Sequence, residues 1–183
     1  MSDDVKRDAK HKKAMQKQKE QVDAGIAAAS TERGVGILLT GDGKGKTSSA
    51  FGMVMRALGY GYKVGVVQFI KGVQLSGEEL YIRDKCPDVT FYQMGTGFTW
   101  DTQDRNRDTE AAQAAFAKAC EMMSGGEFDL VVLDEINIAM RYEYLSVDQV
   151  LEGLEGRAAR TSVILTGRDA KPALCDYADL VTE

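Results

Sequence analysis

A glycine-rich stretch that ends in lysine and threonine is the segment of this chain best suited to chemistry. From Thr40 to Thr47 the chain reads Thr-Gly-Asp-Gly-Lys-Gly-Lys-Thr. Closely spaced glycines let consecutive backbone N–H groups turn toward one anion, lysine adds a point charge, and a threonine hydroxyl is a suitable ligand for Mg²⁺. An apolar run, Gly36–Thr40, precedes the loop and helix-forming residues follow Lys46. This order of strand, glycine loop and helix is typical of a Walker A motif and predicts phosphate binding.

One position departs from the usual motif. Thr40 stands where the pattern normally opens with glycine. The alternative interpretation is a glycine-rich turn without a ligand, but the strand before the loop and the helix after it favour the phosphate site.

Two carboxylates end another apolar run. Asp129–Leu133 reads as a strand, and Asp134 and Glu135 follow it directly, as in a Walker B motif. The carboxyl end of this strand should face the glycine loop, so we expect both acids to share an Mg²⁺ ion with Thr47. Alternatively, they could be acidic residues at the start of the next helix. The guanine-recognition sequence Asn-Lys-x-Asp is absent from the chain, which favours ATP over GTP.

Two aromatic residues stand out in a segment of small residues. Phe98 and Trp100 flank Thr99, and residues two apart in an extended backbone face the same side. Their rings would form one apolar surface for a large flat ligand; alternatively, they could anchor the loop on the core. The single histidine, His11, lies in the charged N-terminal stretch, so the chemistry should depend on carboxylates, lysines, a metal or the reactivity of the substrate.

Short apolar runs alternate with helical patterns along the chain. The expected strands are Gly36–Thr40, Val64–Phe69, Val89–Met94, Asp129–Leu133, Thr161–Thr166 and Leu180–Thr182. The expected helices are Lys46–Leu58, Leu75–Lys85, Asp104–Met123, Asn137–Tyr142, Val147–Leu154 and Pro172–Tyr177. Continuous apolar strands indicate burial on both faces. The predicted fold is therefore α/β, a parallel, doubly wound sheet with helices on both faces.

Composition divides the chain and excludes several functions. Residues 1–24 carry seven lysines and arginines and predict a charged helix or a flexible segment, leaving 25–183 as the ATP-binding domain. The formal charge of −5 argues against nucleic-acid binding, and the apolar runs are too short to cross a membrane. The widely spaced Cys86, Cys120 and Cys175 fit neither zinc nor disulfides, so we expect reduced thiols in a cytoplasmic protein.

Five segments together resemble one known family. They are Thr40–Gly52, Val66–Gly72, Gly97–Gln103, Leu133–Glu135 and Thr166–Arg168. In this order they are similar to the phosphate-loop type of ATP:corrinoid adenosyltransferases, over about residues 23–183. The resemblance implies a P-loop NTPase fold of RecA-like architecture, in which residues 25–183 form an ATP- and corrinoid-binding domain. It also implies transfer of the 5′-deoxyadenosyl group of ATP to the Co(I) of cobalamin or cobyrinic acid a,c-diamide, with release of triphosphate. Mg²⁺, a homodimer and a flavin-type reductase as electron donor are implied as well.

The resemblance also assigns roles to residues. Lys46 would be catalytic, Glu135 would contact the metal, and Phe98 and Trp100 would displace the lower axial ligand of the corrinoid. The nucleotide would be held by the glycine loop, the first helical residues and one arginine: Gly41, Asp42, Gly43, Lys44, Gly45, Lys46, Thr47, Ser48 and Arg168.

Two positions differ from the family pattern, because Asp42 is usually asparagine and Ser48 usually threonine. Members of the family also usually continue beyond the position of Glu183 with a short segment expected to add corrinoid contacts. Two alternatives to adenosyl transfer stay open at this point. One is a small-molecule kinase or ATPase, which would form ADP, and the other is a non-catalytic module that binds ATP or a corrinoid.

Overall fold

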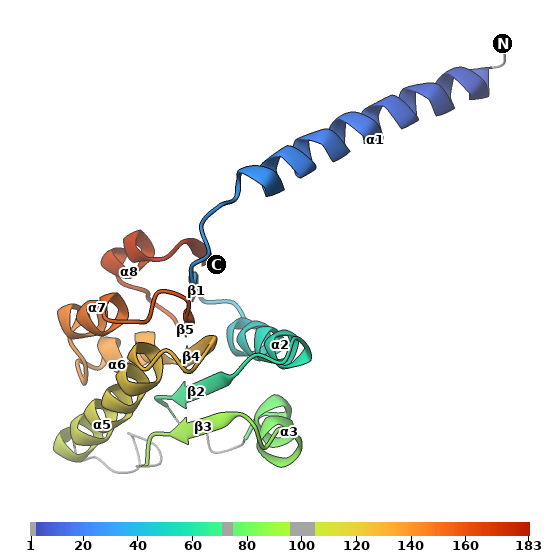
Figure 1. Cartoon of the computed structure of the whole chain (residues 1–183). Helices are drawn as coiled ribbons and strands as arrows, with labels where there is room; N and C mark the ends of the chain where they lie inside the picture. The colour runs from blue at the N-terminus through green and yellow to red at the C-terminus, as the bar shows by residue number, and fades with distance from the viewer. Residues whose placement is uncertain (1–2, 71–74, 96–104) are drawn as a thin grey trace. The chain divides into compact units, whose positions relative to one another are not determined.

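Figure 1 shows the computed structural model of the chain, which describes residues 3–70, 75–95 and 105–183. The chain divides into two compact units, residues 1–32 and 33–183. The first consists mainly of one helix, α1 (Asp3–Ala28), whose side chains from Val5 onward are exposed. It covers most of the segment for which the sequence predicts a charged helix or a flexible stretch. In the part of the chain that the structure describes, no helix combines the length and apolar character needed to span a membrane.

The second unit is built on a six-stranded parallel sheet. The strands are β1 (Gly36–Leu39), β2 (Val64–Gln68), β3 (Thr90–Gln93), β4 (Leu130–Asp134), β5 (Ser162–Thr166) and β6 (Leu180–Thr182). Their order across the sheet is β3-β2-β4-β5-β1-β6, and every neighbouring pair is parallel. The predicted parallel α/β fold is confirmed, and each expected strand is present within two residues of its predicted ends.

Helices cover both faces of the sheet, as predicted (Figure 1). The helices are α2 (Lys46–Gly59), α3 (Gly77–Lys85), α5 (Arg105–Ser124), α6 (Ile136–Arg141), α7 (Val147–Glu155) and α8 (Pro172–Tyr177). Helices α2 and α3 pack on one face through a core that includes Phe51 and Ile82. Helices α5 to α8 pack on the other face through a core that includes Phe116 and Leu174.

The strand sequences explain this double covering. Every residue of β4 is buried, and successive side chains of a strand point to opposite faces. Val132 accordingly joins the core under α2 and α3, while Leu133 joins the core under α5 to α8. A strand buried on both faces needs apolar residues at consecutive positions, which is the pattern seen in the sequence.

One helix begins later than expected. The apolar pattern predicts a start at Leu75, whereas α3 begins at Gly77. The reason is that the Ser76 hydroxyl accepts a hydrogen bond from the Glu79 backbone N–H at 3.1 Å and caps the helix.

Candidate nucleotide and metal site

The glycine loop leads into α2 as the Walker A motif requires. Gly45 occupies the N-cap of α2 with φ of 104°, a left-handed conformation that favours glycine. No described side chain caps this helix end, so its N–H groups and positive end are open to an anion. The Lys46 ammonium donates to the carbonyl oxygens of Gly41, at 2.8 Å, and Gly43, at 2.6 Å. The lysine therefore lies across the loop that it is predicted to serve.

Asp134, at the end of β4, is the centre of a buried polar cluster. Its side chain is only 1% exposed. Oδ1 accepts hydrogen bonds from the hydroxyls of Thr47, at 3.0 Å, and Thr166, at 2.8 Å, and Oδ2 accepts one from the Gln68 amide at 3.1 Å. Burial raises the pKa of Asp134, while the three donors oppose that rise by stabilising the carboxylate. The structure thus brings together Thr47 and Asp134, two of the predicted metal ligands.

Glu135 has an unusual backbone conformation for a side-chain-bearing residue. Its φ is 60°, and its N–H donates to the Thr166 hydroxyl at 2.9 Å. It occupies the N-cap of α6, but its side chain makes no capping hydrogen bond, so the geometry does not support the helix-cap interpretation. Burial and the charge of Asp134 raise the pKa of Glu135, whereas Lys46 and Arg168 lower it. The carboxylate therefore lies within electrostatic reach of both predicted phosphate ligands.

The turn after β5 carries the last predicted phosphate ligand. Gly167 has φ of 126°, and a Cβ there would lie 2.8 Å from the Cβ of Asn137, so no larger residue fits without displacement. The Asn137 amide donates to the Gly167 carbonyl at 2.8 Å and fixes this turn. Arg168 follows, with its guanidinium 3.5 Å from a carboxylate oxygen of Asp42.

The donor set fits Mg²⁺. Thr47, Asp134 and Glu135 offer only oxygen atoms, the ligands that this cation prefers. Within residues 3–70, 75–95 and 105–183, no three histidine, cysteine or acidic side chains form a metal-binding group. Mg²⁺ does not require such a group, because it is usually held by one or two carboxylates, substrate phosphates and water.

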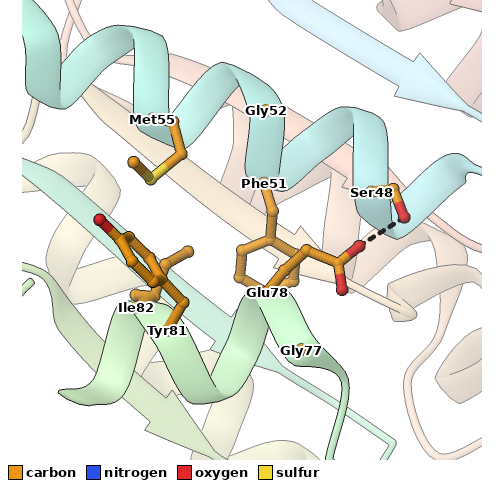
Figure 2. Close-up of a pocket in the computed structure, with 8 residues that line it drawn as sticks. All are labelled: Ser48, Phe51, Gly52, Met55, Gly77, Glu78, Tyr81 and Ile82. Atoms are coloured by element: carbon orange, nitrogen blue, oxygen red, sulfur yellow. Dashed lines mark hydrogen bonds between the residues drawn. The ribbon is translucent and has the colours of Figure 1, made fainter. Parts of the chain in front are cut away.

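An apolar pocket that the sequence did not predict lies beside this site (Figure 2). It has a volume of about 500 Å³ between α2 and α3, and eight residues line it: Ser48, Phe51, Gly52, Met55, Gly77, Glu78, Tyr81 and Ile82. At one end the Ser48 hydroxyl donates to the Glu78 carboxylate at 2.6 Å, which lowers the pKa of Glu78. This bond connects the first turn of α2 to the first turn of α3.

The remaining predicted site residues are either exposed or outside the described part of the chain. Lys44 and Ser48 are exposed on the loop and the first turn of α2. Phe98 and Trp100 lie outside the described residues. Gln68 and Thr166 lie in two of the segments that carry the family resemblance, but the sequence predicted no role for either. Their position in the sequence could have indicated a role in the site, because each is a polar residue at the carboxyl end of a buried strand.

Replacing Asp42 by asparagine is expected to tighten ATP binding roughly two- to fivefold, the range of an exposed ion pair. The substitution frees Arg168 from its carboxylate partner and removes a negative charge near the triphosphate. Calorimetric titration with ATP measures the change, which should shrink at high salt. Glu127→Gln is the matched control, because that carboxylate pairs with Lys63 at 2.7 Å on an exposed surface that is not part of the site. Equal affinity for wild type and Asp42→Asn would show that the Asp42–Arg168 pair does not oppose the nucleotide.

Comparison with known proteins places the chain in a family. Residues 32–183 match the family model described as ATP:corrinoid adenosyltransferase BtuR/CobO/CobP. The corrinoid adenosyltransferase of Pseudomonas aeruginosa is 49% identical over 183 residues, which is all of this chain and 90% of that protein. The corrinoid adenosyltransferase CobA of Salmonella typhimurium is 43% identical over 96% of this chain and 89% of its own length.

Among solved structures, the flagellar accessory protein FlaH from Methanocaldococcus jannaschii is similar, with a TM-score of 0.56 and 14% identity. The match covers 84% of this chain and 72% of that one. At this identity the likeness concerns the fold alone, and it agrees with the expected RecA-like architecture. The family match and the two full-length relatives go further: this chain belongs to the ATP:corrinoid adenosyltransferase family.

Proposed function

We propose that this protein transfers the 5′-deoxyadenosyl group of ATP to the Co(I) of a corrinoid and releases triphosphate. The observation that carries the proposal is the family match over residues 32–183, which contains the whole glycine loop and both carboxylates at the end of β4. The corrinoid, either cobalamin or cobyrinic acid a,c-diamide, is a substrate.

The residues of the site suit this reaction. Co(I) supplies an electron pair that forms the cobalt–carbon bond, the bond between the 5′ carbon and oxygen breaks, and triphosphate leaves with that electron pair. No proton has to be removed from the nucleophile, so the reaction needs no histidine base. The requirement is positive charge around a leaving group that carries several negative charges. Lys46, Arg168 and the N–H groups at the start of α2 provide it.

The residues that would hold Mg²⁺ are Thr47, Asp134 and Glu135. When bound, the ion would supply further positive charge to the phosphates. The short contact between the Thr47 hydroxyl and Asp134, at 3.0 Å, supports this assignment, because it brings two oxygen ligands together beside the loop.

Glu135→Gln is expected to raise the Mg²⁺ concentration needed for half-maximal turnover about tenfold or more, since it keeps the shape of the side chain and removes its charge. Initial rates over a series of Mg²⁺ concentrations measure this shift. Glu127→Gln is the control, because Glu127 pairs with Lys63 at an exposed site, and thermal unfolding checks the fold of both variants. An unchanged Mg²⁺ dependence would remove Glu135 from the metal site and leave the metal role to Asp134 or to residues elsewhere.

We further propose that the enzyme is a homodimer and receives electrons from a flavin-type reductase, as the family resemblance implies. Sedimentation analysis tests the dimer. Reduction of a corrinoid bound to the enzyme, with a flavoprotein as the only electron donor, tests the second point.

The direct test of the activity is anaerobic incubation with ATP, Mg²⁺ and chemically reduced cob(I)alamin. The absorption spectrum should change to that of adenosylcobalamin, at a rate proportional to enzyme concentration. A protein that binds ATP tightly and leaves the cob(I)alamin spectrum unchanged would instead be a non-catalytic binding module.

A further inference from the structure

A row of hydrogen bonds connects the exposed Arg83 of α3 to the buried Asp134. The Arg83 guanidinium donates to Oε1 of Gln93 at 2.8 Å, and Nε2 of Gln93 donates to Oε1 of Gln68 at 2.9 Å. Nε2 of Gln68 then donates to Oδ2 of Asp134 at 3.1 Å. Three hydrogen bonds thus cross from the edge of the sheet to the carboxylate predicted to bind metal.

The strand register explains why this row is continuous. Gln93 pairs with Gln68 between β3 and β2, and Gln68 pairs with Asp134 between β2 and β4. Residues paired across parallel strands point to the same face, and neighbouring strands are about 4.8 Å apart. A glutamine side chain can span that distance and pass a hydrogen bond to the next strand. The row therefore depends on the strand order β3-β2-β4.

The chemistry of the two ends fixes the direction of every bond. A guanidinium only donates and a carboxylate only accepts, whereas an amide does both. Arg83 therefore requires the oxygen of Gln93 to face it, and Asp134 requires the nitrogen of Gln68. With both ends satisfied, the two amides have a single compatible orientation. Without Arg83, the oxygen of Gln93 loses its donor, and only the Asp134 carboxylate still fixes the direction of the row.

Arg83 makes two further contacts. It forms an ion pair with Glu79 at 2.8 Å, and the Glu79 side chain is only 4% exposed. Its guanidinium also lies over the Phe91 ring, 4.3 Å from the centroid, a favourable cation–π geometry. Phe91 in turn stacks on Phe51 of α2, with 6.4 Å between ring centroids. The start of the row is thus in contact with α3, β3 and, through Phe91 and Phe51, α2.

We infer that Arg83, Gln93 and Gln68 are positioning residues that hold the Asp134 carboxylate in its metal-binding orientation. Gln68 occupies Oδ2, which leaves Oδ1 directed at the Thr47 hydroxyl. Partners of this kind, which bind the ligands of a metal, commonly affect metal affinity about 10- to 100-fold. The inference rests on the proposed Mg²⁺ role of Asp134.

Gln93→Glu is the most informative variant. The new carboxylate keeps the shape of the side chain and still accepts from Arg83, but it cannot donate to Gln68. Gln68 then lies between two carboxylates, so the new carboxylate competes with Asp134 for the Gln68 nitrogen. We expect the apparent Mg²⁺ affinity in the ATP complex to fall about tenfold. The added negative charge alone would raise that affinity, so the two explanations predict opposite signs.

Arg83→Met tests the other end of the row, because methionine keeps an apolar stem near Phe91 and removes every donor. We expect a loss of about three- to tenfold in apparent Mg²⁺ affinity. Arg83→Lys retains a donor and should lose less. Lys85→Met removes the same charge from an exposed position of α3 and should have no effect.

The measurement is calorimetric titration of ATP into each variant at a series of Mg²⁺ concentrations and in the presence of a chelator, with thermal unfolding as the check on folding. Metal-free ATP binding should be unchanged in all four variants. Folded Gln93→Glu and Arg83→Met proteins with wild-type Mg²⁺ dependence would overturn the inference. If Asp134→Asn kept the wild-type Mg²⁺ dependence, Asp134 would not be a metal ligand. This inference would then fail together with the proposed metal site.

Discussion

Lys46→Ala is expected to lower the rate of adenosyl transfer at least about 100-fold. Fixed positive charge at a developing anion typically contributes about 3 kcal/mol or more to the transition state, and triphosphate leaves with several negative charges. In the structure the Lys46 ammonium lies across the loop, hydrogen-bonded to the Gly41 and Gly43 carbonyls. The rate at saturating ATP, with cob(I)alamin supplied chemically, measures the effect.

Two checks accompany this variant. Loss of the two hydrogen bonds from Lys46 should loosen the loop, so thermal unfolding separates a catalytic effect from a folding defect. Lys63→Ala is the matched control, because that lysine pairs with Glu127 at an exposed site. Near-normal turnover by folded Lys46→Ala protein would mean that the triphosphate leaves from another site.

Substituting alanine for Phe98 or Trp100 is expected to impair the formation of Co(I) far more than the transfer itself. Together the two rings are proposed to displace the lower axial ligand of the corrinoid and to put in its place an apolar surface that excludes water. Without that ligand the dz² orbital of Co(II) falls in energy and reduction becomes easier. From cob(II)alamin and a weak reductant, activity should fall at least about tenfold, equivalent to about 1.4 kcal/mol in the barrier.

The informative quantity is the contrast between two assays. The same variants should retain most of their activity when cob(I)alamin is supplied already reduced by a strong chemical reductant. Equal losses in both assays would show that the rings serve substrate binding or loop packing.

The sheet was predictable because each of its strands is a short apolar run that can be recognised in the local sequence. The apolar run ending at Leu133 and the acids that follow it indicated a buried strand opening onto the phosphate loop, and the structure has β4 there. Five helices begin within one residue of their predicted starts, and α3 differs because a serine cap decides its start. Local sequence contains the information for these elements.

The polar row was not predictable in the same way. Gln68, Gln93 and Asp134 are far apart in sequence, and only the order β3-β2-β4 makes them neighbours. That order results from long-range packing of helices on both faces of the sheet. The pocket between α2 and α3 has the same origin, since Met55 and Tyr81 meet only after both helices have packed. The roles of Phe98 and Trp100 remain predictions, because these residues lie outside the described part of the chain.

The most direct test of the proposed function is a simultaneous count of both products. ATP labelled in its phosphates is incubated with enzyme, Mg²⁺ and cob(I)alamin, and triphosphate, ADP and adenosylcobalamin are quantified together. Adenosyl transfer predicts one triphosphate for each cobalt–carbon bond, and no triphosphate when the corrinoid is omitted. ADP formed at the same rate with and without corrinoid, and no adenosylcobalamin, would contradict the account and indicate an ATPase.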